Sequence, residues 1–201
     1  MKLRVTAAVM LLLLSCAAAR AQGRRVEVAA GPINVSLSLP AGFERMGDED
    51  VAAQFTRGVT PAAVFREPRR ELRVTVNALD AVGQGVEGVR SLKKRLEADF
   101  AAANPKAVWL ARGVVKLGGT DWVRLHYKAT AGIGEVLSET YATVWAGEAV
   151  VVTFYGPAAE YGAAQRAAFR KSAESIRLSV SVNAPAAEAA PPARPGRKDE
   201  Q

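Results

Sequence analysis

The chain has 201 residues, a formal net charge of +7 and one cysteine, Cys16. Because no thiol follows Cys16, disulfides, a thiol nucleophile and a cysteine-based metal site are excluded from any domain beyond it. The basic excess is modest, and the densest basic stretch has no interleaved aromatic side chains for base stacking, so no nucleic-acid partner is expected.

The first residues have the layout of a secretory signal. Lys2 and Arg4 precede an apolar run over residues 5–14, and small side chains follow this run. The run is about half of the ~20 residues that span a bilayer. We therefore expect an exported protein without a permanent transmembrane helix.

Two processing sites are compatible with this signal. Ala19-Arg20-Ala21 matches the A-x-A pattern and predicts cleavage after Ala21, which leaves a periplasmic or secreted protein that begins at Gln22. The alternative is cleavage before Cys16, with Ser15 as the small preceding residue, although Leu14 departs from the pattern usual in lipoprotein signals. In that case a lipid on Cys16 would tether the protein to a membrane.

Composition divides the chain into three segments. Residues 1–21 form the predicted signal peptide, and residues 22–178 have the size of one ordinary domain. Residues 179–201 are rich in Ala and Pro and lack apolar periodicity, which predicts a disordered tail. Cleavage after Ala21 would remove three basic residues and no acidic one, lowering the formal net charge from +7 to +4.

Strand and helix patterns alternate in the first half of the domain. Residues 33–39 alternate apolar and polar side chains, which predicts a half-buried strand, and Phe43 is expected to return to the core. Residues 48–55 open with acidic side chains and predict a short helix. Residues 62–67 and 72–79 predict two strands joined by a hairpin turn.

The second half begins with the strongest helix pattern, over residues 86–104, where apolar side chains recur at helical spacing. Four strand patterns with short glycine-containing links follow, at residues 107–117, 121–130, 135–146 and 148–156. Such short links require antiparallel neighbours. A closing helix is predicted over residues 160–176, with an apolar side made of Tyr161, Ala164, Ala168, Phe169 and Ile176, interrupted at its edge by Gln165.

The element order predicts an α+β fold, an antiparallel sheet of about six to seven strands with helices packed on it. The segments "LPAGF", "GGTDWVRLHY" and "AAFRKSAESIRL", within residues 26–178, resemble the PsbP/DcrB-like superfamily. The resemblance implies an α/β/α sandwich and a binding or accessory module rather than an enzyme. It carries over no functional residue, because the matched positions are core and turn positions.

The densest basic stretch is "FREPRRELR", at the predicted hairpin turn. Glu67 and Glu71 flank its cations, so a solvated loop explains it adequately. The functional alternative is contact with an anionic lipid or an acidic partner. The residues that would make this contact are Arg66, Arg69, Arg70 and Arg73.

Two short motifs suggest ligands but have simpler explanations. Gly83, Gly85 and Gly88 spell G-x-G-x-x-G before the long helix, yet the preceding strand alternates and no acidic residue follows at the spacing that a dinucleotide site needs. We interpret the motif as a flexible helix entry. The acidic residues at positions 48–50 are interpreted as helix-capping and first-turn residues rather than cation ligands.

No catalytic constellation is visible. His126 is the only histidine, and no serine context suitable for a nucleophile accompanies it. Glu135 and Glu139 share one face of a strand, which an exposed charged face would explain. A pair of catalytic carboxylates depends on tertiary geometry, so a hydrolase stays open as a minor alternative.

The sequence therefore predicts an exported, non-catalytic envelope module that binds, or is accessory to, another envelope protein, with no cofactor and no metal site. The main alternative is a carrier that holds a small apolar ligand between sheet and helix. A deep apolar pocket would favour the carrier, and two carboxylates facing each other in a cleft would favour the hydrolase.

Overall fold

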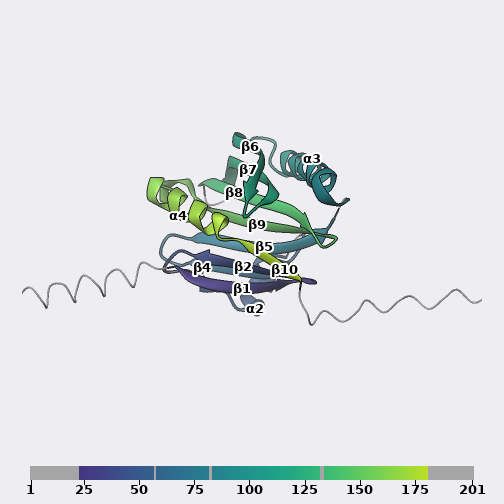
Figure 1. The fold of residues 1–201 in the computed structure, drawn as a ribbon. Helices are drawn as coiled ribbons and strands as arrows, with labels where there is room; N and C mark the ends of the chain where they lie inside the picture. Colours follow the sequence, from purple (N-terminus) through teal and green to yellow (C-terminus); the bar gives the residue numbers. More distant parts are fainter. Residues whose placement is uncertain (1–22, 57, 82, 132–133, 181–201) are drawn as a thin grey trace, which may run out of the picture.

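The computed structural model describes residues 23–56, 58–81, 83–131 and 134–180. The predicted signal peptide, with both of its processing sites, and residues 181–201 of the predicted tail lie outside these described residues. The described residues form two antiparallel sheets and three α-helices (Figure 1). The α+β class predicted from the sequence is confirmed.

The main sheet has seven strands in the order β3-β4-β5-β9-β8-β7-β6, and every neighbouring pair is antiparallel. The strands are β3 (Glu44–Arg45), β4 (Ala63–Glu67), β5 (Leu72–Asp80), β6 (Val108–Leu117), β7 (Thr120–Ala131), β8 (Gly134–Trp145) and β9 (Glu148–Pro157). The predicted four-strand meander is β6 to β9. Its apolar strand β9 lies between β5 and β8, in the interior of the sheet.

A second sheet of three strands, in the order β1-β2-β10, lies apart from the main one. Its strands are β1 (Arg24–Ala30), β2 (Ile33–Leu39) and β10 (Arg177–Val180). The alternation predicted for residues 33–39 is confirmed, because Ile33, Val35 and Leu37 are fully buried while the residues between them are half-buried. The predicted sandwich of one sheet between helices was incomplete, since this small sheet forms part of one outer layer.

One face of the main sheet packs against the small sheet and helix α4 (Ala163–Glu174). Side chains from all three elements form one core, including Val35, Phe154 and Phe169. Phe43 returns to this core as predicted, edge-on to Phe169 with ring centroids 5.8 Å apart. The short 3₁₀ turn η1 (Ala158–Glu160) links β9 to α4.

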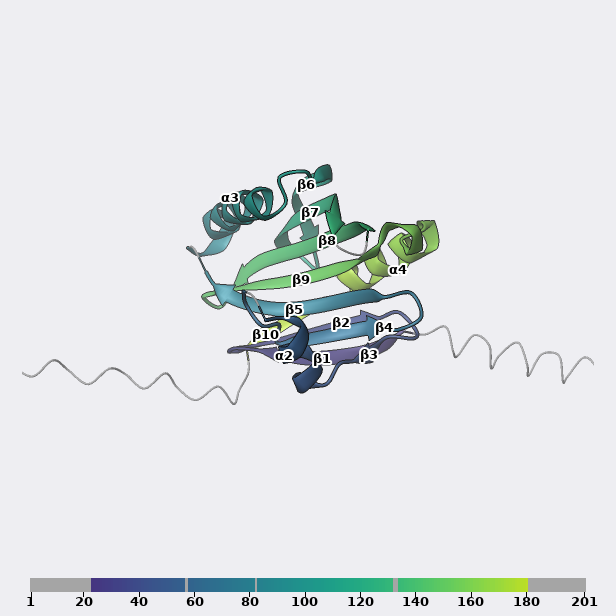
Figure 2. The ribbon, with the colours of Figure 1, turned by 180° about the vertical axis from the view of Figure 1, so that it is seen from behind.

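The opposite face is covered by two helices (Figure 2). Helix α3 (Gly85–Ala103) packs Val89 and Leu92 on a cluster that includes Leu125 of β7. Helix α2 (Asp48–Gln54) packs Val51 against Val64 of β4. Both helices begin and end within two residues of the predicted bounds, since their apolar spacing determines which residues can be buried together.

Candidate functional site

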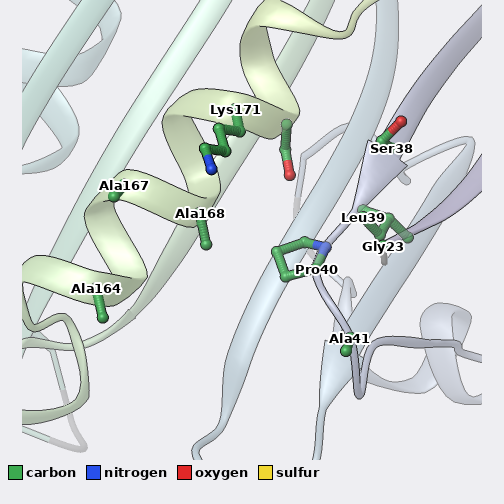
Figure 3. A pocket seen from close by; sticks show the side chains of 10 residues that line it. Gly23, Ser38, Leu39, Pro40, Ala41, Ala164, Ala167, Ala168 and Lys171 are labelled. Carbon is green, nitrogen blue, oxygen red and sulfur yellow. The ribbon is translucent and has the colours of Figure 1, made fainter. Parts of the chain in front are cut away.

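An apolar groove runs between α4 and the end of β2 (Figure 3). One wall is made of alanines at helical spacing on α4, namely Ala164, Ala167 and Ala168. The other wall is the end of β2 and the turn after it, namely Leu39, Pro40 and Ala41. The groove has a volume of about 690 Å³ and is open to solvent. Small side chains on both walls leave this space unfilled.

Of the described residues that line the groove, Lys171 alone has a charged side chain, and its ammonium group points into the groove (Figure 3). Among the described residues it forms no salt bridge. The walls are held together near Lys171, where the Ser38 backbone N–H donates to Ser175 Oγ at 2.7 Å. The Ser175 hydroxyl in turn donates to the Ser172 carbonyl at 2.6 Å. The groove therefore combines fixed apolar walls with one available cation.

A buried polar cluster lies on the sheet face that α4 covers. Glu139 of β8 is only 4% exposed, and its Oε1 accepts from Arg124 Nε at 2.7 Å and from the Tyr141 hydroxyl at 2.9 Å. Burial acts to lower the pKa of Arg124, but the Glu139 charge and hydrogen bond outweigh it, so this pKa is raised. Burial, followed by the Glu139 charge, raises the pKa of Tyr141. Glu139 is thus neutralised by a paired cation.

The expectation that Glu135 and Glu139 share an exposed face was wrong for Glu139. Glu135 lies near the start of β8 and pairs with Lys128 at 2.7 Å, with more than half of its side chain exposed. Glu139 lies four residues farther along the strand, in the region that α4 covers. The shared face was predicted correctly, but its solvent exposure changes along the strand.

His126 faces Glu139 across β7 and β8. Its Nε2 atom is buried and has no hydrogen-bond partner among the described residues. Burial lowers the pKa of His126, the charges of Arg124 and Arg166 lower it further, and the Glu139 charge opposes them. No hydroxyl is held at Nε2, so the geometry of a histidine-activated nucleophile is not formed here.

The other buried carboxylate among the described residues is Glu67, which is 5% exposed. It pairs with Arg70 at 3.2 Å, so both buried carboxylates have a cationic partner. Across all the residues that the structure describes, no group of three or more His, Cys, Asp or Glu side chains is placed to hold a metal ion. The described residues thus form structural ion pairs rather than an acid–base pair.

The four arginines of the predicted hairpin contact differ in their surroundings. Arg66 pairs with Glu44 at 3.4 Å and lies opposite Arg73 in the β4–β5 register. Arg70 turns towards α4, where its Nη1 donates to Gln165 Oε1 at 3.2 Å. Arg69 and Arg73 form no ion pair within the described residues. The hairpin therefore presents free cations as well as paired ones.

The glycine motif lies at the start of α3, as predicted. The preceding strand, β5, is antiparallel to both of its neighbours, which excludes the parallel β-α-β crossover of a dinucleotide site. Gly88 packs against the backbone of Gly83, where a Cβ atom would lie 2.7 Å from the carbonyl carbon. This close approach explains the glycine at position 88 without a ligand.

Acidic residues fill the first turn of α2, as the helix dipole favours, but the expected side-chain cap is absent there. The N-cap residue is Gly47, and no side chain accepts a hydrogen bond at that position. Separately, none of the helices in the described ranges is long and apolar enough to cross a membrane.

Comparisons with known proteins support the fold. No family model matches the chain, and no curated protein matches it by sequence. The solution structure of cyanobacterial PsbP (CyanoP) from Synechocystis sp. PCC 6803 superposes with a TM-score of 0.57 and 12% identity. The match covers 79% of this chain and 94% of CyanoP.

Two other solved structures match over similar lengths. LpqN, a Mycobacterium tuberculosis protein involved in cell envelope biogenesis, has a TM-score of 0.49 and 11% identity, over 77% of this chain and 90% of LpqN. The Saccharomyces cerevisiae Ran-binding protein Mog1p has a TM-score of 0.47 and 14% identity, over 77% of this chain and 95% of Mog1p. At these identities the likeness concerns the fold alone. With its antiparallel sheet, its flanking helices and a superposition that covers 94% of CyanoP, the chain has the PsbP-like fold.

Proposed function

We propose that this chain is an exported, non-catalytic envelope module that holds a segment of another envelope protein in the groove between α4 and β2. The observation that carries the proposal is the groove itself, whose volume of about 690 Å³ lies within the range of known ligand sites. Most of the side chains in its walls are small, so the backbone of a bound segment can approach closely. An apolar peptide face would gain burial there, as in helix-in-groove recognition.

We propose a non-catalytic role because of how the buried polar side chains are paired. Glu139 and Glu67 are each paired with an arginine, and His126 has no activated partner. The envelope location rests on the secretory layout of residues 1–21. Processing after Ala21 and lipidation of Cys16 give the same folded module, either free or tethered.

A small apolar ligand is the second candidate, favoured by a specific observation at Lys171. Its unpaired ammonium group points into an otherwise apolar groove, an arrangement that suits an amphiphile with an anionic end. The groove is open rather than enclosed, which favours a peptide segment over a fully sequestered small molecule.

Site-specific photo-crosslinking in intact cells tests the proposal. A benzophenone amino acid at Ala167, in the groove wall, should give a discrete protein adduct, while the same residue at exposed Lys94 on α3 should not. Adding Ala164→Trp, which fills the groove from an exposed position, should abolish the adduct. The matched substitution Ala101→Trp, at an exposed position of α3, should leave the adduct yield unchanged.

The second candidate gives a different result. The groove serves a small apolar ligand if three results occur together. The purified protein binds N-phenyl-1-naphthylamine, the Ala164→Trp variant does not bind it, and the crosslinker at position 167 gives no protein adduct. Adducts of equal yield from positions 167 and 94, or no binding in either assay, would overturn the assignment of this groove as the site.

A further inference from the structure

We infer that the end of the molecule around the groove is a docking surface for an anionic lipid bilayer. This basic end is formed by the start of β1, strand β3 and the β4–β5 hairpin (left in Figure 1), together with the last turn of α4. Its basic residues are Arg24, Arg25, Arg45, Arg66, Arg69, Arg70, Arg73 and Lys171.

The fold brings these residues together from distant parts of the sequence. Arg24, Arg25 and Arg45 line one shallow pocket with Phe65. Phe65 and Arg66 are neighbours in β4, which pairs directly with β3. Arg70 reaches across to α4 through Gln165, and Lys171 lies six residues farther along that helix. Arg66 and Arg73 lie opposite each other on the other face of the sheet from Phe65, so the basic end gathers cations from both faces of the main sheet at one end of the molecule.

Charge is distributed unevenly between this end and the rest of the described residues. The basic end has eight basic side chains and four acidic ones, Glu27, Glu44, Glu67 and Glu71, a net charge of +4. The other described residues have twelve basic and thirteen acidic side chains, a net charge of −1. An anionic surface would therefore attract the molecule in one orientation.

Ion pairing shows the same contrast. Six of the eight cations at the basic end form no salt bridge within the described residues; only Arg66 and Arg70 do. On α3, by comparison, Arg90, Lys93 and Arg95 each pair with an acidic residue of the same helix. The cations at the basic end are thus available to external anions.

Two features favour a bilayer over an acidic protein. Gly23, the first described residue, lies in the groove wall at this end, so a lipid on Cys16 would be attached within about 25 Å of it. Acyl anchors commonly need a second, polybasic signal for stable membrane binding. The apolar groove also lies at this end, whereas the cations are spread over four elements, and the pocket that Arg24, Arg25 and Arg45 line is small, at about 170 Å³.

Vesicle sedimentation tests the inference on protein that is expressed from the full chain with Cys16→Ala, so that no lipid is attached, and is purified after export. This protein should bind vesicles of mixed phosphatidylglycerol and phosphatidylcholine and should not bind vesicles of pure phosphatidylcholine. The bound protein should dissociate as the salt concentration rises. Arg69→Gln with Arg73→Gln should lower the partition coefficient by roughly 30-fold, because each cation near an anionic surface contributes about fivefold.

Lys94→Gln with Lys106→Gln is the matched control, because it removes two exposed, unpaired cations from α3 and the turn after it. This control should bind like the parent, and both double variants should keep the parent's thermal unfolding. Equal losses in the two double variants, or no binding to anionic vesicles, would overturn the inference. Binding to polyglutamate but not to anionic vesicles would overturn it in favour of an acidic protein partner.

Discussion

Arg124→Met should destabilise the protein strongly, because it leaves Glu139 buried without its cation. The Glu139 side chain is 5% exposed and that of Arg124 is 28% exposed, so water can compensate only slightly. Removing one partner of a buried pair costs about 3–5 kcal/mol. Since Arg124 retains some solvent contact, we expect a loss near the lower limit, about 3 kcal/mol.

Equilibrium unfolding in urea at pH 7 measures this loss, provided that the m-value stays constant. Lys116→Met is the matched control, because Lys116 pairs with Asp121 at 2.9 Å but is 72% exposed. Exposed pairs contribute about 0–1 kcal/mol, so this variant should lose less than about 1 kcal/mol. The two pairs have similar lengths and differ mainly in burial.

The double variant Arg124→Met/Glu139→Leu completes the test. Replacing both charges with apolar side chains removes the buried carboxylate as well as its partner, so most of the lost stability should return. If Arg124→Met costs no more than the exposed-pair control, or if the double variant is as unstable as the single one, the burial of Glu139 is not what makes Arg124 important.

Two further changes test other parts of the fold. Burial lowers the pKa of His126 below its ordinary value of 6.5, so the unfolded chain binds more protons below that pH and stability should fall as pH drops from 6.5. His126→Ala should flatten this slope in urea titrations while changing stability by less than about 1 kcal/mol at pH 7.5, because Nε2 has no partner to lose. Ala146 has φ 49° beside Gly147 in the β8–β9 turn, so Ala146→Asn should stabilise by about 0.5–1 kcal/mol, and a lower melting temperature would contradict this.

The sequence predicted the strands of the main sheet well, because alternation and short turns leave few ways to pair them. It did not predict β1, β10 or β3, the two-residue strand at the edge of the main sheet. Strand β1 alternates Val26, Val28 and Ala30 but directly follows the predicted signal, and β10 has only four residues. A strand that short has no periodicity of its own, and it forms here because β2 offers it an edge.

The groove was hidden by an error in the phase of the last helix. The predicted helix began at residue 160, which put Tyr161, Ala164 and Ala168 on one buried side. Tyr161 in fact precedes the helix, which begins at Ala163, and Ala164 is exposed. Gln165, predicted at the edge of the apolar side, is buried against the hairpin. Tyr161 is buried but lies outside the helix, so a stripe drawn through it is displaced. The buried side of α4 is Gln165, Phe169, Ser172 and Ala173, and Ala164 and Ala168 lie beside it in the groove wall.

Helix α4 connects the buried polar cluster, the basic hairpin and the groove. Phe169 and Ala173 fix the helix on the main sheet, while Arg170 lines a small cleft with Arg124 and Tyr141. On its opposite flank the alanines form the groove wall, and near its start Gln165 accepts from the hairpin. One helix therefore bears contacts to the cleft of Arg124 and Tyr141 on one flank, to the hairpin near its start and to the groove on the other flank. The buried ion pair, which has no visible chemistry of its own, lies on the sheet face that this helix covers.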